Sequence, residues 1–167
     1  CLYRINKAKQ MTIIKTILKK EFKSLITSPI AYIYIISFLL FVNWYFFRNF
    51  FLVGQATLRE LFNLMPWILL FLMPAISMRS WSEEKKSGTL DFLLTFPIHD
   101  HELVIGKFLA SFLLLSLTIL GTFPLVLIVI FLGSPDIGPI ITGYIGSLLL
   151  GASYLAIGFF ISSLTRN

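Results

Sequence analysis

The residues best suited to chemistry are four consecutive polar side chains, His99, Asp100, His101 and Glu102. Imidazoles and carboxylates are groups that divalent metal ions such as Zn²⁺ accept as ligands. Consecutive residues of a helix point in different directions, so these four side chains would not converge on one ion. Asp100 is better interpreted as the N-cap of the following helix, with Glu102 stabilised near the helix N-terminus. The sequence therefore predicts no metal site, and an enzyme using this cluster at a membrane interface stays open as an alternative.

Other motifs for catalysis or nucleotide binding are missing from the chain. No GxxxxGK[ST] phosphate-binding loop occurs, since Gly106 and Lys107 are followed by Phe108. Neither GxSxG nor HExxH is present. No ionisable residue lies in the middle of any hydrophobic run, which argues against an ion-coupled transporter. We therefore expect a protein without enzymatic activity and without a cofactor of its own.

The composition is that of a membrane protein. Hydrophobic residues make up 57% of the chain, charged residues only 13%, and the mean hydropathy is +0.86. A soluble domain carries about 25% charged residues. The net charge is +6, and half of the fourteen Lys and Arg residues lie within residues 1–23. Beside hydrophobic runs, such a basic segment favours anionic lipid over nucleic acid as its partner.

Residues 11–27 form the first patterned segment. Apolar residues recur there at the spacing of one helical stripe: Ile13, Ile14, Ile17, Leu18, Phe22, Leu25 and Ile26. Off the stripe lie four basic residues: Lys15, Lys19, Lys20 and Lys23. We expect an amphipathic helix in the membrane interface, anchored by these lysines, with packing on a soluble domain as the alternative. Ser28 and Pro29 end it, and residues 1–10 are interpreted as a possible upstream extension.

Hydrophobic runs predict four membrane spans, over residues 30–47, 61–78, 108–132 and 140–164. The first would be roughly 27 Å long as a helix, close to the thickness of a hydrocarbon core. The second contains Pro66 and Pro74, which should bend it. The third is interrupted by Gly121 and Pro124, so we expect a break in the helix there.

Two features of the spans predict contacts between helices. Gly143, Ser147 and Gly151 recur at a spacing of four residues, which lets helices approach closely in lipid. Asn43 is a polar, uncharged residue in the first span, and we expect it to make an interhelical hydrogen bond.

The distribution of positive charge predicts the orientation of the spans. With four spans, the N-terminal segment, the connection over residues 79–107 and Arg166 share one side of the membrane. Twelve of the fourteen Lys and Arg residues lie in these regions, and only Arg48 and Arg59 lie on the other side. The positive-inside rule therefore places the N-terminus and the 79–107 connection in the cytoplasm.

The 79–107 connection is the one long polar stretch between spans. We expect a short helix over residues 87–96, ended by Pro97, rather than one starting earlier near Ser82. Its apolar face consists of three leucines: Leu90, Leu93 and Leu94. This helix could lie on the membrane or dock into a groove on a cytoplasmic partner. Four basic and five acidic residues nearly cancel, which makes anionic lipid a poor ligand and favours a protein partner.

The run SEEKKSGTLDFLLTFP, with Gly106 and Lys107 at the following span, resembles the loop between the second and third spans of ABC-2-type exporter permeases. It is especially similar to the branch that includes gliding-motility and copper- or haem-related bacterial permeases. The N-terminal helix that ends at Ser28 and Pro29 is similar to the start of these permeases as well. The resemblance extends over nearly everything from Met11 onward.

This resemblance implies an all-α membrane protein: an interfacial helix, four transmembrane helices and a cytoplasmic coupling helix. Residues 11–167 would form a C-terminally incomplete transmembrane domain of a six-span permease in a bacterial plasma membrane. The implied partners are a second permease subunit and a separate cytoplasmic ABC ATPase, which would bind the ATP. A membrane scaffold that transports nothing is a further alternative.

By motif position, the resemblance assigns the ATPase contact to nine residues: Glu83, Glu84, Gly88, Thr89, Leu90, Asp91, Leu93, Leu94 and Pro97. Asp91 stands where members of this family often have Glu, and Phe96 where they often have a small polar residue. Because these two positions depart from the pattern, the details of the contact are left open here.

Overall fold

The computed structural model describes the chain over residues 2–53, 57–87, 100–133 and 135–164, and its side chains over residues 14–51, 57–77, 103–133 and 135–162. Within these ranges every regular element is an α-helix and no strand occurs, which confirms the predicted fold class. The helices are α1 (Leu2–Thr27), α2 (Pro29–Val53), α3 (Arg59–Ser87), α5 (Asp100–Leu120), α6 (Phe123–Leu132) and α7 (Ile137–Leu164).

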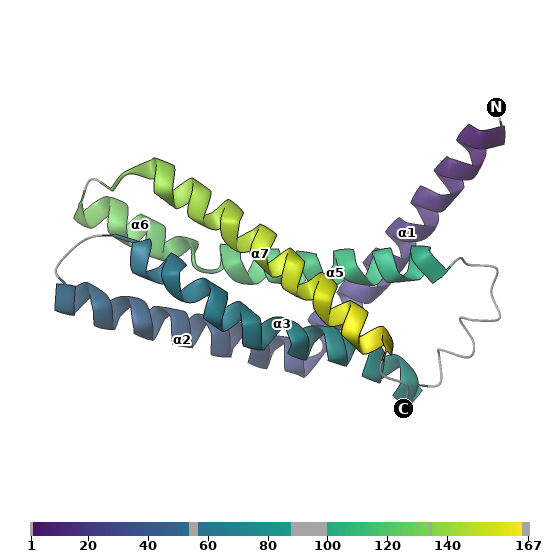
Figure 1. Cartoon of the computed structure of the whole chain (residues 1–167), viewed down its shortest axis with the longest axis horizontal. Helices are drawn as coiled ribbons and strands as arrows, with labels where there is room; N and C mark the ends of the chain where they lie inside the picture. The colour runs from purple at the N-terminus through teal and green to yellow at the C-terminus, as the bar shows by residue number, and fades with distance from the viewer. Residues whose placement is uncertain (1, 54–56, 88–99, 134, 165–167) are drawn as a thin grey trace.

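Four helical stretches are long and apolar enough to cross a membrane, and they lie where four spans were predicted. They cover Pro29–Phe51, Arg59–Ser77, Leu103–Leu132 and Ile137–Ser162. The third consists of α5 and α6 together, and all four run along the long axis of the molecule (Figure 1).

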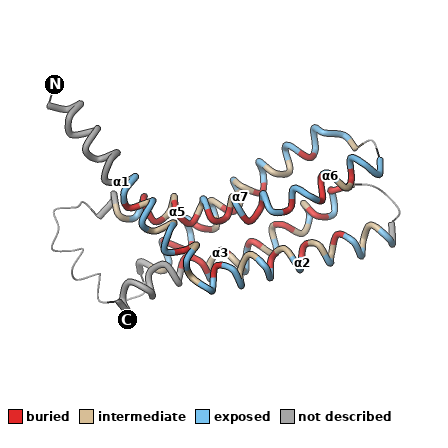
Figure 2. Tube along the Cα trace, turned by 180° about the vertical axis from the view of Figure 1, so that it is seen from behind, coloured by how far each residue is buried: buried red, intermediate tan, exposed pale blue. Residues whose placement is uncertain are grey.

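Exposed residues line the outward faces of these helices (Figure 2), and many of them are large and apolar. Leu40, Phe71 and Phe131 are 67%, 77% and 85% exposed. A soluble monomer rarely leaves so much contiguous apolar surface in water, whereas hydrocarbon solvates it at no cost. The four spans therefore bury only part of their surface against each other and present the rest to lipid.

Two hydrophobic clusters divide the interior along the bundle. One joins α2, α3, α6 and α7 around Met65 and Val129. The other joins α2, α3, α5 and α7 around Leu69 and Leu115. The border between the clusters coincides with the end of α5 and the start of α6. The predicted break in the third span thus separates two packing units rather than merely bending one helix.

The break itself follows from local chemistry. Pro124 has no amide hydrogen and so cannot continue the ladder of hydrogen bonds. The amide of Thr122 bonds instead to the carbonyl of Ile119 at 3.0 Å, which is the tighter pattern of a 3₁₀ turn. The buried hydroxyl of Thr122 lies 2.9 Å from the hydroxyl of Tyr144 on α7. This hydrogen bond ties the break to the fourth span.

Replacing Tyr144 with phenylalanine should remove this hydrogen bond and lower the free energy of unfolding only slightly. We expect a loss of about 0.6 kcal/mol, the average for hydrogen bonds between transmembrane helices, and a fall in melting temperature on the order of 2 °C. Thr122 keeps its bond to the Ile119 carbonyl, at 2.7 Å, so no orphaned group adds to the loss. Thermal unfolding in detergent measures the effect. Tyr154→Phe on the same helix is the control, because the Tyr154 hydroxyl bonds to no described residue; equal shifts would contradict the role of Tyr144.

The amphipathic helix at the N-terminus packs on the bundle. The second half of α1 lies against the first half of α5 (Figure 1). Its stripe residues Ile17 and Leu25 are buried, and a Cβ built on Gly106 would lie only 2.6 Å from Ile17 Cγ2. The chain's own spans therefore cover part of the stripe that the sequence assigned to the membrane interface. The four lysines outside the apolar stripe are exposed on the other face of α1: Lys15, Lys19, Lys20 and Lys23.

The prediction for Asn43 was wrong. Its side-chain amide donates to the carbonyl of Leu39 on its own helix, at 2.7 Å, instead of to another helix. A short polar side chain in a helix reaches the carbonyl four residues back more easily than a distant partner. A hydrogen bond between two spans occurs instead between the hydroxyls of Thr122 and Tyr144.

Candidate functional site

The polar connection between the second and third spans begins as helix, not as loop. The sequence favoured a helix start near residue 87, but α3 continues without interruption through Ser87. Residues 79–87 contain no glycine or proline, and Gly88 is the first residue that disfavours helix. The second span and the start of the connection therefore form one continuous helix, with Pro66 and Pro74 inside it.

Of the residues assigned to the ATPase contact, Glu83 and Glu84 lie on this extension of α3. The remaining seven lie outside the described residues: Gly88, Thr89, Leu90, Asp91, Leu93, Leu94 and Pro97. The connection thus leaves the bundle from α3 and returns to it at Asp100, where α5 begins.

The cluster of histidines and carboxylates is split by the same boundary. His99 lies outside the described residues, and Asp100, His101 and Glu102 form the first turn of α5. Asp100, expected at the N-cap, is the first residue of that helix. Among the side chains that the structure describes, no three His, Cys, Asp or Glu gather as a metal site would require.

Lys107 lies where α5 emerges from the polar connection, and its position was not foreseen. The sequence interpretation counted it among the cations of the connection, yet its side chain is 0% exposed. Its neighbour Gly106 contacts Ile17 of α1, so Lys107 is buried at the crossing of α1 and α5. A buried ammonium is very costly unless it is paired, and Lys107 has an interaction partner in the structure. This end of α5 therefore packs on α1 at Gly106 and buries a paired lysine in the next position.

The small residues of α7 receive side chains from the two helices that flank the polar connection. A Cβ on Gly143 would lie 2.5 Å from the ring of Phe62 on α3, and one on Gly151 would overlap Leu115 of α5. Ser147 between them is buried and donates to the carbonyl of Gly143 at 2.8 Å.

A further glycine, outside the spacing that the sequence analysis used, extends these contacts. A Cβ on Gly158 would overlap the hydroxyl of Ser77 on α3. The most extensive helix contact of the fourth span is with α3, and it also packs along α5. The two helices on either side of the polar connection, α3 and α5, therefore both pack on α7.

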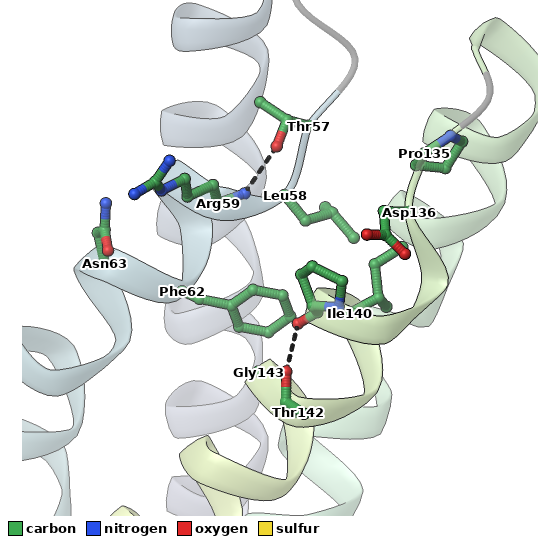
Figure 3. A pocket seen from close by; sticks show the side chains of 11 residues that line it. Thr57, Leu58, Arg59, Phe62, Asn63, Pro135, Asp136, Ile140, Thr142 and Gly143 are labelled. Carbon is green, nitrogen blue, oxygen red and sulfur yellow. Dashed lines mark hydrogen bonds between the residues drawn. The ribbon is translucent and has the colours of Figure 1, made fainter.

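The opposite end of the bundle contains a cavity of about 550 Å³. It lies between the start of α3 and the start of α7 (Figure 3). Thr57 Oγ1 accepts from the amide of Arg59 at 3.2 Å, and Asp136 Oδ1 accepts from the amide of Gly138 at 3.2 Å. These two side chains satisfy amides that the first turns of α3 and α7 leave open.

Comparison with known proteins gives the family. The family described as ABC-2 family transporter protein matches residues 15–167. The chain is also similar to the Probable ABC transporter permease protein NosY of Pseudomonas aeruginosa, with 36% identity over 103 residues. That alignment covers 56% of this chain and 38% of the relative, so the chain matches well under half the length of that protein. Because the family match extends over nearly the whole chain, the chain belongs to the ABC-2 family of transporter proteins.

Proposed function

We propose that this chain is a transmembrane permease subunit of an ATP-driven ABC transporter of the export type. A separate cytoplasmic ABC ATPase subunit binds and hydrolyses the ATP, and a second permease subunit completes the pore. The family membership and the name of the relative support the permease assignment. The organism of the relative supports a bacterial plasma membrane as the location.

The observation that carries the proposal is the anchorage of the polar connection. α3 enters it as an unbroken helix, α5 leaves it beside a fully buried lysine, and both helices pack on α7. A force applied to residues 88–99 would reach three spans through rigid contacts rather than being absorbed by a flexible linker. No phosphate-binding loop occurs in this sequence, and the proposal therefore assigns the ATP-driven force to another subunit.

The docking element is the leucine face that the sequence predicts over residues 87–96. Leu90, Leu93 and Leu94 enter an apolar groove on the ATPase, and Glu83, Glu84 and Asp91 set the register by charge. When ATP closes the ATPase subunits, the docked segment moves with them and tilts α3 against α7. The lysines on the exposed face of α1 hold that helix to anionic lipid beside this contact.

The proposal requires residues 79–107 to lie in the cytoplasm, which labelling can test. With Cys1 replaced by serine, Ser87→Cys should resist a membrane-impermeant maleimide in intact spheroplasts and react after lysis. Gly138→Cys, on the exposed first turn of α7 at the opposite end, should react in both preparations. Reaction of Ser87→Cys in intact spheroplasts would overturn the proposal, because no ATP-driven subunit could reach that face.

A further inference from the structure

The cavity between the first turns of α3 and α7 lies where these helices enter the membrane. The second candidate span begins at Arg59 and the fourth at Ile137, and both positions are beside the cavity. Its mouth is therefore at the level of lipid headgroups, at the end of the bundle away from α1 and the polar connection (Figures 1 and 3). A volume of about 550 Å³ is within the range of sites for small molecules.

Opposite charges line this cavity without neutralising each other. Arg59 lies on one side and Asp136 on the other, with Leu58 and Phe62 between them (Figure 3). No ion pair joins these two side chains, although both belong to the described part of the chain. One oxygen of Asp136 accepts from the Gly138 amide, and the other oxygen accepts from no described residue. The formal charges of the cavity thus sum to zero while both signs are available.

The inner wall of the cavity is apolar. Leu58 and Ile140 are almost completely buried, and the ring of Phe62 covers Gly143. Such a wall offers nothing to a hydrated inorganic ion, but it accommodates the carbon chain attached to a polar head. The nearby hydroxyl of Thr142 is occupied by the carbonyls of Gly138 and Pro139, at 3.0 and 3.2 Å. Asn63 is a further polar lining residue, but the only formal charges in the lining are those of Arg59 and Asp136, and these two distinguish one charged head from another.

We propose that this cavity binds a zwitterionic amphiphile, a phosphoethanolamine head carrying an apolar tail. Arg59 pairs with the phosphate, helped by the positive N-terminus of α3, and Asp136 pairs with the ammonium group. An anionic head would be attracted to Arg59 and repelled by Asp136. A cationic head would be attracted to Asp136 and repelled by Arg59. Only a head with both charges satisfies both residues, and the cavity's position at the membrane boundary supplies such heads from the bilayer itself.

Native mass spectrometry of the transporter purified from membranes tests this assignment. The protein is offered phosphatidylethanolamine and phosphatidylglycerol with identical acyl chains. We expect retention of the ethanolamine lipid to exceed that of the glycerol lipid by about fivefold, as one partly exposed charge pair would give. Asp136→Asn should abolish this preference while keeping the helix cap, because asparagine caps as well as aspartate does.

The chain offers matched controls at the same end of the bundle. Arg59→Gln should also remove the preference, whereas Arg48→Gln and Glu60→Gln change equivalent charges that do not line the cavity. Soluble glycerophosphoethanolamine distinguishes the source of the head. Displacement of the lipid at millimolar concentration means that the head alone suffices, and failure to displace it means that the tails are required; both results support a zwitterionic site.

Two results would overturn the assignment. One is equal retention of the two lipids by the unsubstituted protein. The other is an equal loss of preference in the Arg48→Gln and Glu60→Gln controls, which would indicate a general effect of surface charge. Thermal unfolding of each variant shows whether it is folded, and the ratio of the two lipids bound by a folded variant does not depend on how much of it was recovered.

Discussion

Replacing Leu93 with aspartate is expected to abolish co-purification of the cytoplasmic ATPase while the spans still insert into the membrane. Leu93 is central to the leucine face predicted over residues 87–96. A carboxylate forced into an apolar groove loses its hydration without gaining a partner, which costs several kcal/mol. That corresponds to a loss of affinity of about a hundredfold or more. Affinity purification of the permease, followed by quantification of the ATPase, measures the result.

The same polar segment provides the control for this experiment. Thr95→Asp adds the same charge two residues away, outside the leucine face. We expect this variant to retain the ATPase at close to the level of the unsubstituted protein. If Leu93→Asp kept the ATPase, the docking role of the leucine face would be wrong. Loss in both variants would mean that any added negative charge disrupts the contact.

Replacing Gly151 with leucine is expected to force the fourth span away from α5. An added Cβ alone would overlap Leu115, whose side chain is completely buried in the cluster that joins four helices. Because Leu115 is completely buried, it can turn aside only against its neighbours in the cluster, and the rest of the leucine side chain adds further volume at the same contact. Overpacking of this kind costs about 3 kcal/mol, which lowers the melting temperature on the order of 5–10 °C.

Gly146 on the same helix is a close match for this substitution. A Cβ on Gly146 would meet nothing within 4 Å, so a leucine there projects into open surroundings. Gly146→Leu should leave the melting temperature unchanged or raise it slightly, because leucine favours helix over glycine by about 0.8 kcal/mol. Thermal unfolding and size-exclusion profiles in detergent compare the two proteins. Similar behaviour of both variants would show that glycine on α7 matters for helix propensity and not for packing.

The positions of the spans could be predicted from the sequence because hydropathy is a local property. A run of apolar residues long enough to cross the bilayer has few other stable environments. Pro29 and Pro124 each lie in the first turn of a new helix, where the missing amide hydrogen does no harm. The exposed face of α1 was predictable for the same reason, since Lys15 and Lys23 share one side of any helix formed by that segment. These features depend on neighbours in the chain and not on the fold.

Contacts between distant segments were decided only by the tertiary structure. The spacing of Gly143 and Gly151 predicts small residues on one face of the helix. It does not reveal that Gly143 contacts Phe62 of α3 and that Gly151 contacts Leu115 of α5. The sequence groups Lys107 with the cations of the polar connection. In the folded chain, where α1 packs on α5, its side chain is completely buried.

The same holds for the cavity at the far end, because Arg59 and Asp136 line the same cavity only through the packing of α3 on α7. Lipid solvates every apolar face equally well, so hydropathy reveals which residues enter the membrane but carries no information about which helix each face will meet.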